Sequence, residues 1–320
     1  GDHCKAASDL GLPFVAVGLL YQQGYFIQTI DAQGQQIARY QSHSSDELPI
    51  TPVTQGNGEQ LKVSVPFPGR LVVARVWQAR VGHIRLYLLD SHTEENSEQD
   101  RELTQRLYGG DESTRISQEM LLGIGGTRVL EALGLSPTAW HINEGHAAFL
   151  ILERCRQRMT EGLSFEAALE AVAASTLFPT HTPVPAGHDI FSRDLVQHAL
   201  GRYLEESGLD FETVFALGAK AGDHSFNMTS LGLRGSRFHN GVSRIHGGVA
   251  SAMEGAIWPQ IPPEENPIGY ITNGVHVPTF LAPEWASLFD IHAPTWKSEL
   301  RNPEFWSFVD QIPDYHYWSV

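Results

Sequence analysis

The residues best suited to chemistry gather in the segment 227–250, whose sequence is NMTSLGLRGSRFHNGVSRIHGGVA. This segment holds two Asn, two His, three Arg and five Gly, although the whole chain carries a formal net charge of −15. Amide, imidazole and guanidinium groups donate hydrogen bonds, and Gly lets a backbone approach a ligand closely. The pattern predicts a loop that runs into a helix and faces a ligand rich in hydroxyl or phosphate groups.

Three further polar motifs each follow a short apolar run. They are HINEGH at 141–146, HTPVPAGH at 181–188 and TNGVH at 272–276. In a parallel sheet covered by helices, ligands bind beyond the carboxyl ends of the strands, where such loops converge. Together with the loop before residue 243, the motifs predict a single cleft.

The histidines invite a metal interpretation, because several of them stand near Glu144: His141, His146, His181, His188, His239 and His246. The spacing HxxExH is not that of a zinc-protease helix, and Gly145 favours a turn over a rigid helical face. The ordinary alternative for each His is a loop residue bonded to backbone carbonyl groups. We therefore expect no metal site.

Two other kinds of chemistry lack their signature. Ser236 and Ser243 have His residues nearby, but no GxSxG elbow occurs in the chain, which argues against acyl transfer. The glycines of the GIGG run at 123–126 lie inside a helical pattern, so close packing explains them better than a phosphate loop. Neither observation supports a triad or a nucleotide fingerprint.

A sugar or another polyol fits the polar loops best. Asn and His both donate and accept hydrogen bonds, as hydroxyl recognition requires. The prolines within TPVP at 182–185 would hold His181 in a fixed position. Asn273 ends an apolar strand and meets Gly274, from where its side chain can project into a cleft.

The secondary-structure signals change at about residue 113. Before it, apolar runs and turn signals predict a helix at 2–10 and strands at 14–21, 25–31, 61–67, 70–80 and 83–90. After it, helical patterns at 117–133, 147–160, 165–174, 192–207, 211–221 and 243–256 alternate with strands at 139–143, 175–181 and 268–273. This alternation predicts an α/β fold with a mostly parallel sheet, in which 24–92 is a β-rich subregion and 113–290 the α/β part.

Composition excludes several partners. The chain has 37 acidic and 22 basic residues, which argues against nucleic acid or an anionic membrane. No apolar run reaches the roughly 18–20 residues of a membrane helix. Cys4 and Cys155 provide no disulfide framework, so we expect a cytoplasmic protein. Gly1 is not preceded by Met and the chain stops in an aromatic string at 315–320, which we interpret as cuts through a larger protein.

The motifs together resemble the α-glucan (glycogen, starch, maltodextrin) phosphorylases of the bacterial and archaeal branch. The matching text, in family order, is GDHCKAASDLGLPFVAVGLLYQQGYFIQ at 1–28, HINEGHAAF at 141–149, HTPVPAGHDIF at 181–191, NGVSRIHGGVA at 240–250 and TNGVHVPTFLAPEW at 272–285. The resemblance implies a GT-B fold, of which residues 1–320 would form most of the first Rossmann-like domain. It also implies phosphorolysis of terminal α-1,4-linked glucose to α-glucose 1-phosphate, with retention of configuration.

The resemblance further assigns roles to single residues. His181 matches the catalytic His whose side chain and backbone carbonyl meet the transferred glucose. Asn273 matches the Asn that binds this sugar near its 6-hydroxyl, and Val242 matches an apolar contact to the ring. Asp111, in YGGD at 108–111, matches loosely an acidic residue that lines the site.

Other family features are supporting or missing. Glu144 and His146 would support the site without reacting, and Phe280 stands where relatives commonly carry Trp. The resemblance implies pyridoxal 5'-phosphate (PLP) as cofactor, but the Lys that bonds PLP and the residues that bind phosphate belong to the second domain, and no motif here matches them. The predicted partners are an α-1,4-glucan or maltooligosaccharide and inorganic phosphate, and a homo-oligomer is left open. We expect this chain alone to be inactive as an enzyme.

Two alternatives stay open at the level of sequence. One is a GT-B glucosyltransferase that uses a nucleotide sugar, and the other is a glucan-binding protein without catalytic activity. A maltooligosaccharide titration, repeated after His181→Ala and Asn273→Ala, separates a cleft from a surface glucan site.

Overall fold

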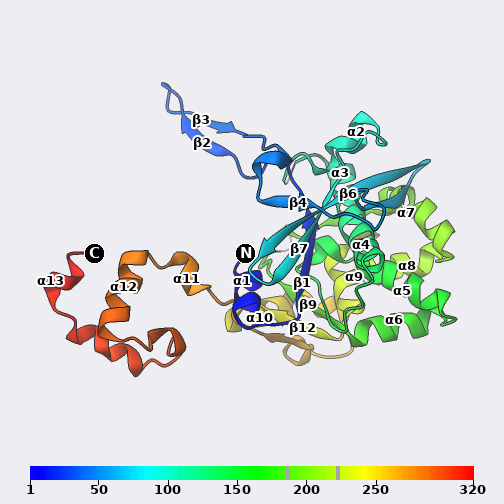
Figure 1. The fold of residues 1–320 in the computed structure, drawn as a ribbon. Helices are drawn as coiled ribbons and strands as arrows, with labels where there is room; N and C mark the ends of the chain where they lie inside the picture. Colours follow the sequence, from blue (N-terminus) through cyan, green and yellow to red (C-terminus); the bar gives the residue numbers. More distant parts are fainter. Residues whose placement is uncertain (108, 185–186, 221–223) are drawn as a thin grey trace.

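The computed structural model describes residues 1–107, 109–184, 187–220 and 224–320 (Figure 1). Two sheets form its framework. The first is a five-stranded mixed sheet in the order β1-β7-β6-β4, with β5 also paired to β6. The second is a four-stranded sheet in the order β13-β12-β9-β8.

The mixed sheet contains four of the strands predicted in the first third of the chain and one that was not predicted, Ile50–Pro52, whereas the strand predicted at 25–31 belongs to a separate hairpin. The bounds in the mixed sheet are β1 Val15–Leu19, β4 Ile50–Pro52, β5 Lys62–Phe67, β6 Arg70–Val81 and β7 Ile84–Asp90. β5, β6 and β7 are joined by tight turns at the predicted positions, where Gly69 and Gly82 have positive φ angles. β1 pairs parallel to β7, so this sheet begins upstream of the predicted β-rich subregion.

The second sheet is parallel throughout, as the strand and helix alternation predicted. It comprises β8 Trp140–His141, β9 Thr176–Thr180, β12 Phe238–Gly241 and β13 Ile268–Tyr270. Parallel strands need a crossover between them, and helices provide it here. A separate antiparallel pair is formed by β10 Ile190–Ser192 and β11 Ser225–Asn227.

Apart from Glu98–Arg101 and Met228–Arg234, which were not predicted, the main helices lie close to the predicted ranges. They are α3 Glu112–Met120, α4 Gly126–Ala132, α5 Leu150–Thr160, α6 Phe165–Ala174, α7 Arg193–Ser207, α8 Phe211–Gly218, α9 Met228–Arg234 and α10 Arg244–Met253, with short α2 Glu98–Arg101. Several begin at a Ser or Asp whose side chain accepts a backbone N–H, as at Ser164 and Asp210. Ala221, in the predicted helix 211–221, lies outside the described residues.

The segment 227–250 differs in part from its prediction. Helix α10 is the helix predicted at 243–256, but the stretch before it, predicted as a loop, contains helix α9 and strand β12. Its glycines serve packing, since a Cβ on Gly241 would lie 2.6 Å from the backbone nitrogen of Gly247. Arg234 donates to three carbonyl groups at the end of α8, at 2.7–3.0 Å, and Arg237 pairs with Glu170. These two arginines are therefore structural.

One helical prediction needs a finer description. The predicted helix 117–133 is α3 and α4 joined by a π-helical turn, Leu121–Gly125. A Cβ on Gly123 would lie 2.7 Å from the backbone nitrogen of Leu150, and one on Gly126 would lie 3.0 Å from Cγ1 of Val17. The GIGG run is thus a packing feature, as predicted, which brings the helix close to α5 and β1.

The hydrophobic core connects both sheets with the helices between them. It includes Val65 and Leu89 of the mixed sheet, Ile124 of the π-helical turn and Phe178 of β9, all fully buried. Core contacts on both sides of the helices fix the position of the parallel sheet and its loops. No helix among the described residues is long and apolar enough to cross a membrane.

Two segments extend from this body in Figure 1. One is the antiparallel hairpin of β2 Ile27–Ile30 and β3 Gln36–Arg39. The other, which we call the C-terminal arm, comprises residues 277–320 with α11 Val277–Phe280, α12 Pro283–His292 and α13 Asp314–Tyr317. The arm packs its own aromatic cluster around Phe289, whose ring contacts Trp285, Trp296, Trp306 and Phe308. Helix α1, Asp2–Asp9, lies between the arm and the body.

Candidate functional site

The four polar loops lie at one edge of the parallel sheet. Strands β8, β9, β12 and β13 run in the same direction and end at His141, Thr180, Gly241 and Tyr270. The predicted motifs follow these ends directly, so the expected convergence of loops is present. We call the residues that link these loops the strand-end network: Glu144, His181, Thr182, Val242, His246 and Asn273.

Glu144 holds the loop after β9. Its backbone has φ 71° and ψ −176°, and it is the only described residue other than Gly with a positive φ. Its buried carboxylate accepts the backbone N–H groups of His181 at 2.6 Å and Thr182 at 3.0 Å through Oε2. The Thr182 hydroxyl donates to the same oxygen at 3.1 Å. A strained backbone costs about 1–3 kcal/mol and persists where the surroundings determine it, which marks functional sites.

His246 links the loop after β9 to the loop after β12. Its Nδ1 accepts the backbone N–H of Val242 at 3.1 Å, so the hydrogen sits on Nε2, which donates to the Thr182 carbonyl at 3.2 Å. These bonds select one neutral tautomer. The carbonyl of Val242 in turn accepts the N–H of Asn273 at 3.0 Å. His181, Val242 and Asn273 therefore belong to one hydrogen-bonded network.

The imidazole of His181 has an unsatisfied polar atom. The residue is half-buried, and its Nε2, which is itself buried, makes no hydrogen bond within the described part of the chain. Burial lowers the pKa of His181, opposed by the Glu144 carboxylate and reinforced by His246 and His146. At neutral pH the ring is uncharged, so it can both donate to and accept from a sugar hydroxyl.

A second imidazole beside it is also kept neutral. Burial, with smaller contributions from His3 and His181, lowers the pKa of His141 to about 4. The rings of His3 and His141 lie edge to face, with centroids 5.2 Å apart. The sheet edge is therefore lined by neutral donor and acceptor groups rather than by positive charge.

Asp111 has a different position. Its Oδ1 accepts the backbone N–H of Thr114 at 2.9 Å and the Thr114 hydroxyl at 3.1 Å, which caps helix α3 and lowers the pKa of Asp111. Its carboxylate is exposed. The hydrogen bonds within the described residues link it to none of the other three predicted site residues. Its contact with sugar stays a prediction, and Tyr108 of the same motif lies outside the described residues.

The structure adds an ionic cluster that the sequence did not reveal. The Arg115 guanidinium donates to both carboxylate oxygens of Asp189, at 3.0 and 3.2 Å, and Nδ1 of His146 lies 2.9 Å from Asp189. Against burial, which acts in the opposite direction, these bonds hold the pKa of Asp189 below its ordinary value. Burial beside Asp189 raises the pKa of Glu119 well above its usual range. Asp189 stands in the matched motif at 181–191, of which Pro185 and Ala186 are not described, but its partner Arg115 is 74 residues away in sequence.

This cluster contains a group of residues that could hold a metal ion, so the expectation of no metal site stays a prediction. Glu119, His146 and Asp189 place their ligand atoms within 4.8 Å of one another. Arg115 already occupies Asp189, and its positive charge beside His146 opposes a metal cation. His239 instead contacts backbone carbonyl oxygens at 2.9–3.1 Å, which is the ordinary alternative foreseen for a loop His.

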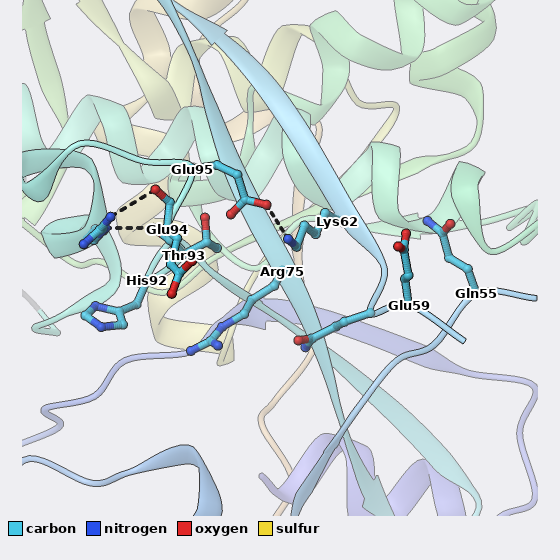
Figure 2. A pocket seen from close by; sticks show the side chains of 10 residues that line it. Gln55, Glu59, Lys62, Arg75, His92, Thr93, Glu94 and Glu95 are labelled. Carbon is cyan, nitrogen blue, oxygen red and sulfur yellow. Dashed lines mark hydrogen bonds and ion pairs between the residues drawn. The ribbon is translucent and has the colours of Figure 1, made fainter. Parts of the chain in front are cut away.

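A groove of about 1040 Å³ lies elsewhere, over the mixed sheet, and Figure 2 shows its lining. Lys62 pairs with Glu95, and Arg101 donates to the carbonyl oxygens of Thr93 and Glu94 at 2.7 and 3.0 Å. None of the site residues predicted from the sequence lines this groove, so it is separate from the strand-end network.

Three relatives decide the family of the chain. It is 44% identical to the maltodextrin phosphorylase of Thermococcus litoralis over 321 residues, and 44% identical to the glycogen phosphorylase of Mycobacterium tuberculosis over 333 residues. The glycogen phosphorylase of Aquifex aeolicus is 34% identical over 322 residues. All three matches cover 100% of this chain. The chain is homologous to the N-terminal part of the bacterial and archaeal glycogen and maltodextrin phosphorylases.

This phosphorylase homologue spans 38% of the length of the first two relatives and 46% of the third. No family model matches the chain. The resemblance drawn from its motifs is therefore confirmed by the pairwise matches. The roles of His181, Val242, Asn273 and Asp111 stay predictions.

Proposed function

We propose that this chain forms the glucan-binding part of an α-1,4-glucan phosphorylase. The supporting observation is the strand-end network, which joins His181, Val242 and Asn273 at the carboxyl edge of a parallel sheet. The activity proposed for the whole enzyme is phosphorolysis of the terminal α-1,4-linked glucose. The partners are then an α-1,4-glucan and inorganic phosphate, the product is α-glucose 1-phosphate with retained configuration, and the location is cytoplasmic.

The proposed architecture is GT-B, with residues 1–320 as most of the first Rossmann-like domain. Two observations support it: the four-stranded parallel sheet, and the position of the polar loops beyond its carboxyl ends. Gly241 and Gly247 bring α10 into close contact with β12 and β13. The start of α10 therefore lies beside Val242, where a ligand would meet the loop.

The site residues contact different parts of one glucosyl unit. The neutral imidazole of His181 and the amide of Asn273 can bind hydroxyl groups, and Val242 offers an apolar surface to the ring. Glu144 carries negative charge behind the main chain of His181. Because the transferred glucosyl group becomes positively charged at its anomeric carbon, a fixed carboxylate and carbonyl dipoles nearby stabilise the transition state more than the substrate.

PLP would supply its phosphate as a proton partner to the attacking phosphate in the whole enzyme, but the residues present do not fit its attachment. The chain has four lysines, and each has a partner: Lys5 with Thr279, Lys62 with Glu95, Lys220 with Glu254 and Lys297 with Asp290. None is a free amine in an apolar pocket, as a Schiff-base lysine needs to be. We therefore assign no step of the reaction in this chain to the cofactor.

A titration with maltoheptaose tests the proposal. Wild-type chain should bind, and His181→Ala and Asn273→Ala should each weaken binding about 3- to 10-fold, the effect of one lost hydrogen bond. His198→Ala, on the exposed surface of α7, is the matched control and should bind like wild type. Unchanged affinity in both site variants would indicate a surface glucan site and a non-catalytic binding protein instead.

A further inference from the structure

Helix α1 presents a polar face to the start of the C-terminal arm. Asp2, Lys5 and Asp9 are spaced by three and four residues, so they lie on one side of the helix. All three contact the segment 276–279. The first motif that the chain shares with the phosphorylases therefore has a structural partner more than 260 residues away.

The contacts form a series of hydrogen bonds in which each group donates to the next, from Lys5 to Asp9. Lys5 Nζ donates to the Thr279 hydroxyl at 2.9 Å, and that hydroxyl lies 2.7 Å from Nδ1 of His276. Nε2 of His276 lies 2.9 Å from Oδ2 of Asp9. Because Lys5 can only donate, the Thr279 hydroxyl is free to donate to Nδ1, which leaves the imidazole hydrogen on Nε2, facing Asp9.

A further bond fixes the main chain. The backbone N–H of His276 donates to the Asp2 carboxylate at 3.2 Å. The imidazole of His276 is mostly buried, with a side-chain exposure of 13%, although Asp9 is 66% exposed. We call these five residues, Asp2, Lys5, Asp9, His276 and Thr279, the α1 latch.

The latch stands three residues after Asn273. The segment 271–276 has no regular secondary structure, and its upstream side is attached to β12 and the following loop by the N–H groups of Ile271 and Asn273, each at 3.0 Å from its acceptor. Downstream, the α1 latch is its attachment to the body. Asn273 is therefore held between two fixed points, one on each side.

We propose that the α1 latch positions Asn273 for the glucosyl unit, and that His276 is the positioning residue at its centre. This inference rests on the proposed function, in which Asn273 contacts the sugar near its 6-hydroxyl. If the latch is released, Asn273 keeps its amide but loses its fixed direction. The consequence is a loss of discrimination at that hydroxyl, because a general loss of fold would weaken all ligands alike.

The test compares two ligands that differ at one group. Maltoheptaose and its analogue with a 6-deoxy non-reducing terminal glucose are titrated into the chain by calorimetry. Wild type should prefer the natural ligand by about 3- to 10-fold, since one hydrogen bond is at stake. His276→Ala and Asp9→Ala should bring this ratio close to 1, as should Asn273→Ala. His276→Gln should retain part of it, because a Gln amide N–H can occupy the place of Nε2 and still donate to Asp9.

Matched controls and a ligand-free measurement complete the design. His198→Gln and Asp310→Ala alter exposed residues away from the latch and should keep the wild-type ratio. Amide hydrogen exchange at 271–281 should quicken in Asp9→Ala and His276→Ala but not in the controls. If exchange at these amides stays at the wild-type rate, the latch does not hold the segment and the inference is overturned.

The outcomes separate the two proposals. Wild-type discrimination that Asn273→Ala abolishes and the latch variants retain would overturn the latch while the proposed function stands. No binding by wild type, or equal affinity for both ligands, would overturn the sugar contact of Asn273 and with it the inference. Loss of the ratio in Asn273→Ala and in both latch variants, at unchanged thermal stability, would support it.

Discussion

At the scale of single residues, Glu144 contributes most to the strand-end network. Its left-handed backbone would suit Gly, yet the position carries a buried carboxylate that accepts four donors through one oxygen. Its other oxygen, Oε1, is buried and without a hydrogen-bond partner among the described residues. This arrangement costs free energy, and its result is the fixed position of His181.

Replacing Glu144 should therefore lower the stability of the chain considerably. Glu144→Ala leaves the buried N–H groups of His181 and Thr182 without an acceptor, and we expect it to lower the free energy of unfolding by about 2–4 kcal/mol. Urea denaturation measures the change. Glu161→Ala, which removes an exposed carboxylate paired only with Arg158, should cost less than about 1 kcal/mol. Equal losses of unfolding free energy in the two variants would contradict the role of Glu144 in holding the loop after β9.

His141 should make stability depend on pH. Its pKa is about 4 in the folded chain, below the ordinary histidine value of 6.5, so below about pH 6.5 the unfolded chain takes up the proton first. Stability linked to His141 is thus complete above pH 6.5 and falls as the pH drops toward 4. We expect His141→Gln to lose less stability than wild type between pH 7 and pH 5, measured by urea midpoints. His198→Gln should follow wild type, and an identical loss in His141→Gln would refute the assignment.

Some residues of the site could be predicted from the sequence, and others could not. His181, Val242 and Asn273 were found because each follows a strand within a family motif, and the structure joins them in one network. Arg115, Glu119 and Asp189 were missed, since their cluster forms only when α3 meets the loops after β8 and β9. Asp111 illustrates a third case: its residue type and place fit both a sugar contact and a helix cap, and the structure shows the cap.

At the scale of elements, close packing at the π-helical turn fixes the helices against the sheet. Gly123 faces the start of α5, where a Cβ would also lie 2.9 Å from Cβ of Phe149. Gly201, in the middle of α7, has open space around the same position. The two glycines therefore form a matched pair in helical segments.

Substituting each by Ala should have opposite effects. Gly123→Ala must displace backbone atoms and should destabilise the chain by about 1–3 kcal/mol. Gly201→Ala meets no neighbour and should stabilise it by up to about 1 kcal/mol, the helix propensity difference. Thermal unfolding of both variants measures the difference. Destabilisation by Gly201→Ala, or none by Gly123→Ala, would show that backbone approach is not the reason for Gly at 123.

Most elements could be predicted because their patterns are local. Helix α6 begins after a capping Ser164 and was predicted at the observed bounds, 165–174. The prediction was wrong for the stretch of 227–250 before α10, because its polar and Gly-rich composition conceals helix α9, whose buried face is formed by small and apolar residues such as Met228 and Leu231. Composition described its surface chemistry, whereas packing against Phe178 and α8 decided its conformation.

At the scale of the whole molecule, the two sheets share one core and leave the hairpin and the C-terminal arm outside it. Of the arm, only the aromatic string at 315–320 was singled out from the sequence, and the aromatic cluster around Phe289 was not predicted. The course of the arm could not be predicted, since it depends on contacts with α1 at the other end of the chain. The parallel sheet, in contrast, followed from strand and helix alternation alone.

The whole molecule also determines whether the chain can catalyse phosphorolysis by itself. Because none of its four lysines fits the attachment of PLP, we expect the isolated chain to release no α-glucose 1-phosphate from glycogen and phosphate. A coupled assay with phosphoglucomutase and glucose-6-phosphate dehydrogenase measures it. Turnover by the purified chain, sensitive to His181→Ala, would refute this prediction.

The projecting hairpin offers a place to attach a reporter. Its tip at Gln33 and Gly34 is organised locally, since Asp31 accepts the N–H groups of Gln33 and Gln35 at 2.9 and 2.8 Å. Burial raises the pKa of the Cys155 thiol to about 12, so maleimide dyes at neutral pH should pass it by. After Cys4→Ala, a Gln33→Cys variant would carry a single fluorophore away from the strand-end network, and its polarisation could follow docking of large glucans.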